Sequence, residues 1–129
     1  MDLKYEVKTN KTFDQAINSL KNSLSRVGFG VLWELNFKDK LKEKGLDLAH
    51  NFKIFEVCNP KKAKEVLETY LEVGYFLPCK VVVYEKEDSI FIGMLKPTML
   101  MDMIGKADLT NIAKEVEEEL KKAIDMAAN

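Results

Sequence analysis

Residues 80–94, KVVVYEKEDSIFIGM, carry the strongest β-sheet signal in the chain and decide the class of fold. Residues 80–85 are rich in β-branched side chains, and a polar turn at residues 87–89 separates them from a second apolar run at residues 90–94. β-Branched and aromatic residues favour strands, and a short polar segment between two such runs is typical of a hairpin. The sequence therefore predicts two antiparallel strands here.

Around this hairpin, the spacing of apolar residues predicts further strands and helices. We expect strands at residues 3–7, 31–36 and 52–57, and helices at residues 13–27, 37–45, 60–70 and 109–124. The order β-α-β-α-β-α-β-β-α combines crossover connections with a hairpin. We therefore expect an α+β fold with a single mixed five-stranded sheet and helices packed mainly on one face.

The length and composition of the chain indicate one globular domain, residues 1–129, that ends in a long amphipathic helix. A chain of 129 residues is of single-domain size, and the net charge of -1 gives no strong field of either sign. Arg26 is the only arginine, which disfavours nucleic-acid recognition, and no apolar run is long enough to span a membrane. Two cysteines without a secretion signal favour reduced thiols in the cytoplasm.

The segment Cys58-Asn59-Pro60 contains the first candidate site, because it lies where a strand is followed by a helix. Asn59 is a good helix cap and Pro60 suits the first helical position. The first turn of a helix presents free N–H groups, and Lys61 and Lys62 at this position are better explained by a bound anion. The sequence predicts that Asn59, Lys61, Lys62 and, from the neighbouring hairpin, Lys80 bind a small anionic ligand. Two solvated lysines are the alternative.

Cys58 and Cys79 are the candidate reactive thiols. A helix N-terminus would stabilise the Cys58 thiolate, whereas a buried cysteine would only pack. If their strands run parallel, the two cysteines lie at opposite ends of the sheet. If the connection at residues 71–78 carries the chain back, the two sulfur atoms meet.

Ionisable side chains within the apolar strands are further candidates for acid or base chemistry. Glu34 and Glu56 would have perturbed pKa values on a covered sheet face, near Lys80, and Glu34 is the candidate catalytic carboxylate. On a solvated face each would be an ordinary surface residue.

No metal or cofactor is expected. His50 is the only histidine, so zinc sites and catalytic triads lack their usual base. Met99, Met101 and Met103 form a weak soft-metal pattern for Cu(I), although methionines more often fill apolar gaps.

Several motifs resemble those of the bacterial and archaeal proteins grouped as domain of unknown function family 302. They are Gly28-Phe29-Gly30-Val31-Leu32 with Glu34, Cys58-Asn59-Pro60 with Ala63, and the segment from Leu77 to Glu85. The resemblance covers most of the chain, about residues 5–97, and implies a compact α+β fold. It implies no established reaction.

Three classes of function follow from these observations, with a non-catalytic role favoured over an enzymatic one. The first is a module that binds a small anionic molecule after Cys58, with Trp33, Tyr84 or the methionines supplying apolar contacts. The second is a thiol-based redox protein or enzyme that uses Cys58 or Cys79. The third is a homodimeric assembly protein that pairs through residues 99–104.

Overall fold

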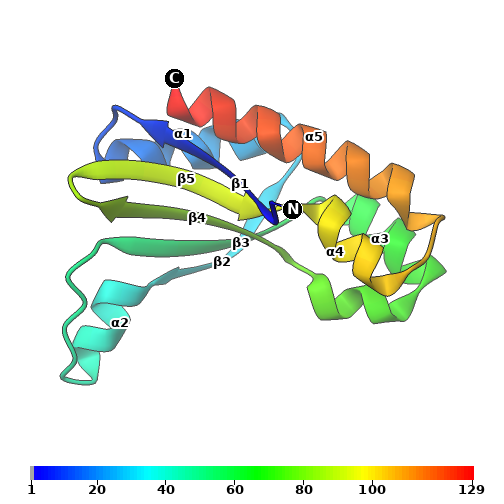
Figure 1. Cartoon of the computed structure of the whole chain (residues 1–129), viewed down its shortest axis with the longest axis horizontal. Helices are drawn as coiled ribbons and strands as arrows, with labels where there is room; N and C mark the ends of the chain where they lie inside the picture. The colour runs from blue at the N-terminus through cyan, green and yellow to red at the C-terminus, as the bar shows by residue number, and fades with distance from the viewer. Residues whose placement is uncertain (1) are drawn as a thin grey trace.

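The computed structural model describes residues 2–129, which form one five-stranded sheet with helices packed against it (Figure 1). In chain order the elements are β1 (Lys4–Thr9), α1 (Phe13–Arg26), β2 (Gly30–Asn36), α2 (Phe37–Glu43), β3 (Phe52–Cys58), α3 (Pro60–Thr69), the 3-10 helix η1 (Leu71–Phe76), β4 (Cys79–Lys86), β5 (Ser89–Leu95), α4 (Pro97–Ile104) and α5 (Leu109–Ala128). The predicted α+β class and the number of strands are confirmed.

The strands lie in the order β1-β5-β4-β3-β2, and every neighbouring pair is antiparallel. The prediction of a mixed sheet is therefore wrong. A parallel pair needs a connection that returns along the whole strand. α2 has seven residues, which span only about 10 Å, and after α3 the chain turns back through η1. Both connections therefore leave the sheet and return at the same end.

α1 and α5 cover one face of the sheet and pack along each other (Figure 1). α1 begins with the predicted capping box, in which Thr12 Oγ1 accepts from the Gln15 N–H and Gln15 Oε1 accepts from the Thr12 N–H. Leu20 and Leu24 on α1 are fully buried. They belong to the main core with Phe55, Val57, Val81, Val83, Ile92, Leu120 and Ile124.

A second, smaller apolar cluster lies beyond the end of the sheet. Its buried members come from four helices and are Val66, Val73, Met101, Leu109, Ile112 and Ala113. The N-terminal third of α5 supplies three of them, so this helix extends past the sheet and carries the second cluster as well as the main core. Among residues 2–129, no helix combines the length and the apolar composition required to cross a bilayer.

The methionine-rich segment forms α4, which a side chain of α5 holds in place. Lys96 precedes α4 and its side chain makes no capping hydrogen bond. Instead, Glu117 Oε1 accepts hydrogen bonds from the Thr98 N–H at 3.1 Å and from Thr98 Oγ1 at 2.7 Å. Burial opposes ionisation of Glu117, but the Thr98 hydrogen bonds and Lys121 outweigh it, and the pKa of Glu117 is lowered. Glu117 thus acts as the missing cap of α4.

The Glu117 contact predicts a pH-dependent contribution to stability. Because its pKa is lowered by folding, the contribution is present above the unfolded-state pKa, about 4.3, and is lost as the pH falls through the folded-state value. Glu117→Ala should lower the free energy of unfolding by about 1–3 kcal/mol at pH 7, measured by urea denaturation. Glu118→Ala, at the exposed neighbouring position, should change it little. An equal effect of both variants, or a Glu117→Ala effect that does not decrease as the pH is lowered through the acid range, would contradict this role.

Candidate functional site

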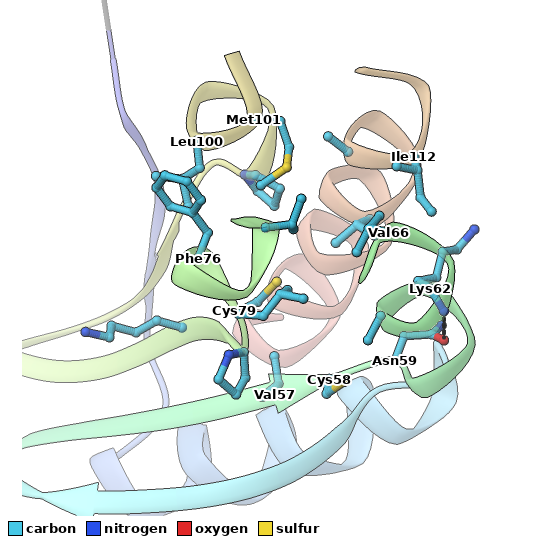
Figure 2. Close-up of a pocket in the computed structure, with 18 of the residues that line it drawn as sticks. Val57, Cys58, Asn59, Lys62, Val66, Phe76, Cys79, Leu100, Met101 and Ile112 are labelled. Atoms are coloured by element: carbon cyan, nitrogen blue, oxygen red, sulfur yellow. Dashed lines mark hydrogen bonds between the residues drawn. The ribbon is translucent and has the colours of Figure 1, made fainter. Parts of the chain in front are cut away.

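A cavity of about 450 Å3 lies at the end of the sheet where β3 finishes and β4 begins. α3, η1, α4 and α5 surround it, and side chains from all of them point into the space between these helices and the strand ends (Figure 2). Its walls are mainly apolar. They include Val57, Val66, Phe76, Leu100, Met101 and Ile112.

The start of α3 supplies the polar part of the wall. Asn59 Oδ1 accepts a hydrogen bond from the Lys62 N–H at 3.3 Å, and the Asn59 carbonyl accepts from the Ala63 N–H at 2.9 Å. Pro60 has no N–H. Among the described residues only the Lys61 N–H of this turn lacks a hydrogen-bond partner, so the helix terminus offers fewer free donors than the sequence pattern suggested.

Lys62 lines the cavity and reaches across to α5, where its ammonium group pairs with Glu115. This hydrogen bond raises the pKa of Lys62. The Glu115 side chain is 60% exposed, and ion pairs with an exposed partner contribute about 0–1 kcal/mol. Another carboxylate could therefore replace Glu115 at Lys62 with little loss of free energy.

Three of the four predicted ligand-binding residues line this cavity: Asn59, Lys62 and Lys80. Lys61 is exposed and is not part of the wall. Lys80 lies on β4 opposite Glu56 on β3, and both side chains border the cavity. Three of the four residues named from the sequence pattern therefore share one cavity wall.

Both cysteines also line the cavity, and both are free thiols. β3 and β4 are antiparallel with Val57 opposite Cys79, so Cys58 and Cys79 lie at the same end of the sheet. Of the two arrangements considered above, the chain adopts the one in which the connection returns. Burial raises the pKa of Cys58, and burial together with the nearby Cys58 raises the pKa of Cys79 to about 11. The helix terminus predicts a shift in the opposite direction.

Glu34, the candidate catalytic carboxylate, lies outside the cavity. It forms ion pairs with Lys21 at 2.8 Å and with Lys53 at 2.9 Å on the helix-covered face of β2 and β3. Partial burial opposes its ionisation, but the hydrogen bonds from these two lysines outweigh burial and lower the pKa of Glu34. Glu34 is thus a paired surface carboxylate, separate from Lys80 and from both thiols.

The three methionines of the soft-metal pattern do not face one another. Their segment is helical, and positions two residues apart on a helix differ in direction by about 200°. Met101 is buried against the cavity, whereas Met103 is 73% exposed. The described residues also contain no group of three or more His, Cys, Asp or Glu side chains placed to hold a metal ion.

Sequence reasoning missed the contribution of α4, η1 and α5 to the cavity wall. Trp33 and Tyr84, two of the predicted apolar contacts, do not line it; Met101 does. The sequence did contain one signal for the contribution of α5. Its apolar face continues through Leu109, Ile112 and Ala113, so the apolar face is longer than α1 and the sheet can bury. The assignment of this part of the face to a second cluster depends on the tertiary fold.

Comparison with known proteins agrees with this architecture. The family model described as domain of unknown function DUF302 matches residues 5–127. The chain is a member of the DUF302 family. A crystal structure of an uncharacterised conserved DUF302 protein from Bacillus stearothermophilus superimposes with a TM-score of 0.95 at 43% sequence identity, covering 98% of this chain and 99% of that one.

An uncharacterised protein from Aquifex aeolicus (strain VF5) is 34% identical over 76 residues, which are 55% of this chain and 52% of that relative. The chain therefore spans about half the length of this relative. Together the comparisons confirm the resemblance drawn from the motifs around Gly28, Cys58 and Cys79. Both relatives are described as uncharacterised, so any assignment of function depends on the site.

The raised pKa values predict slow reaction of both native thiols with iodoacetamide at pH 7, because the thiolate is the reactive form. The rate should rise steeply with pH, and Cys79 should react more slowly than Cys58. Each of the variants Cys58→Ser and Cys79→Ser retains a single thiol, whose alkylation rate can be followed by mass spectrometry. The alkylation rate of the same variant unfolded in urea is the reference. Either native thiol reacting at pH 7 as fast as in urea would contradict the prediction.

Proposed function

We propose that this DUF302 protein is a non-catalytic module that binds a small molecule with an apolar body and an anionic end. The cavity between the strand ends and α3, η1, α4 and α5 carries the proposal. Its volume, about 450 Å3, lies within the range of small-molecule sites, which are mostly apolar with a few polar groups.

A few polar groups in the mainly apolar wall support a ligand with a distinct polar end. Asn59 and Lys62 come from the start of α3, and Lys80 comes from the start of β4. A carboxylate beside the start of α3 would pair with Lys62 in place of Glu115. Met101, Val66 and Ile112 would contact the apolar body.

The thiols are better explained as part of the apolar wall. A redox or nucleophilic role requires a thiolate near neutral pH, and both cysteines have raised pKa values. Their free state supports the cytoplasmic location expected from the sequence, since reducing compartments keep thiols unpaired.

Titration with a series of linear carboxylates from acetate to octanoate tests the proposal. Each added methylene buried in the cavity should raise the affinity by up to roughly fourfold, equivalent to about 0.8 kcal/mol. Octanoate should shift the amide resonances of Lys61, Lys62 and Ala63 together with the methyl resonances of Val66 and Met101 in NMR spectra. Octan-1-ol should shift the methyl resonances with less effect on the α3 amides.

Matched variants distinguish the contribution of the carboxylate to the affinity from that of the apolar body. Lys62→Gln should weaken octanoate binding roughly fivefold, about 1 kcal/mol, and leave octan-1-ol unaffected. Lys64→Gln removes a neighbouring lysine that pairs with Glu68 away from the cavity and should change neither. Ala63→Phe should fill the cavity and abolish both. Affinity independent of chain length, or equal losses in Lys62→Gln and Lys64→Gln, would refute the proposal.

A further inference from the structure

The face of the sheet opposite α1 and α5 has an apolar centre that no helix covers (Figure 1). Charged side chains lie toward its edges and ends, on Lys4, Glu6, Lys8, Glu56, Lys80 and Lys86. We call this face of the sheet the open face. Strand register and the alternation of side chains place eight apolar residues on it. They are Trp33, Leu35, Phe52, Ile54, Val82, Tyr84, Phe91 and Leu95.

This composition is unusual for a sheet covered on one side. An antiparallel sheet with one solvated face normally carries polar residues at its outward positions. Here β3, β4 and β5 place apolar side chains on both faces, and Trp33 and Leu95 on the open face are 51% and 46% exposed. Leu95 also borders the cavity, whereas Trp33 does not.

We propose that the open face binds a second copy of this chain, about a twofold axis that runs along β4. β4 is the central strand, with two strands on either side. A twofold axis along it places β5 of one copy over β3 of the other, and β1 over β2. The same surface then meets itself, as a closed dimer requires.

The aromatic side chains of the open face match this symmetry. Phe91, Tyr84 and Phe52 are opposite one another on successive strands, with ring centroids 5.3 Å and 5.6 Å apart. The row is centred on Tyr84 of the middle strand. The axis therefore places Tyr84 over Tyr84 and Phe91 over Phe52 of the other copy, a contact between aromatic side chains in both directions.

The next two rows of side chains mix apolar and charged residues. Gly93 is buried between Val82 and Glu6, and the Tyr84 hydroxyl donates a hydrogen bond to Glu6 Oε2. The axis brings Ile54 of the other copy over Gly93, and one row nearer the cavity it brings Leu95 over Glu56 and Lys80 close to Lys80. A Cβ atom at Gly93 would lie 3.0 Å from the Tyr5 carbonyl oxygen, so the sheet itself keeps this position small.

At the edges, lysines of β1 meet aromatic rings of β2 and α2. Lys4 and Lys8 occupy outward positions on β1 and are exposed. The axis places Lys4 near Trp33 and Lys8 near Phe37 of the other copy. Each lysine then covers a ring with its aliphatic stem and can form a cation–π contact with it.

The area available is sufficient for a specific dimer. Five strands about 4.8 Å apart and about seven residues long present roughly 550 Å2 on each copy, or about 1,100 Å2 in total. A specific interface needs about 1,000 Å2 or more. The third function class expected from the sequence placed the contact at residues 99–104. In that segment Met101 is buried, and of its apolar side chains only Met103 is strongly exposed. The open face is the larger and more continuous surface.

Sedimentation equilibrium between about 1 and 500 µM tests the proposal on the wild-type protein. We expect a concentration-dependent mass that reaches twice that of the chain. Trp33 is the only tryptophan, so its fluorescence should shift to the blue over the same concentrations as the dimer forms. A monomer mass throughout this range would overturn the proposal, and so would a dimer with unchanged Trp33 emission.

Substitutions on the open face should separate the copies without unfolding them. Phe91→Lys should raise the dimer dissociation constant at least roughly a hundredfold. Leu71→Lys, at a side chain that is 80% exposed on η1, should leave it unchanged. If circular dichroism shows that Phe91→Lys is unfolded, the dimer dissociation constant can be measured on Trp33→Lys, which changes a more exposed position. Dimers that persist in the folded open-face variant would overturn the proposal.

The orientation of the axis has its own test. Phe52→Glu alone should also be monomeric. Mixing it with Phe91→Lys should restore a heterodimer, because the axis brings residue 91 of one copy to residue 52 of the other. Failure of the mixture to associate, while both variants are folded, would rule out this axis.

Discussion

The antiparallel pairing of β3 with β4 is the constraint on which the site depends. Val57 lies opposite Cys79, so the segment between them must leave and re-enter the sheet at one end. α3 and η1 make up that segment and lie beyond the strand ends (Figure 1). The cavity lies between these two helices, the strand ends and the part of α5 that extends past the sheet. With parallel pairing, Cys79 would lie at the opposite end of the sheet from Cys58 and the start of α3.

Local signals predicted the helices and strands well, because capping, turns and periodicity are read within a few residues. Thr12, Gln15, Asn59 and Pro60 lie where their helices begin, as expected. Strand direction is a non-local property, since it depends on where a connection runs. The path of η1 sets the relative direction of β3 and β4, and the sequence of η1 did not indicate that path. The cavity wall was missed for the same reason, because it joins helices that are distant in the sequence.

The polar and apolar parts of the site have separate structural supports. Asn59 caps α3 and so fixes the backbone beside Lys62, whereas Glu117 fixes α4 and with it the cavity side chain of Met101. Burial of Cys58 and Cys79 in the same wall keeps their thiols protonated. This protonated state agrees with the proposed binding role. The open face meets this cavity at Glu56, Lys80 and Leu95, which border both.

Intermolecular nuclear Overhauser effects between octanoate and the methyl groups of the protein test the location of the ligand most directly. The account predicts contacts from the terminal methyl of octanoate to the methyl groups of Val66, Met101 and Ile112. The methylene next to the carboxylate should lie closest to Ala63. Contacts to Leu35, Ile54 or Val82 on the open face, or none to the cavity methyl groups at saturating octanoate, would contradict it.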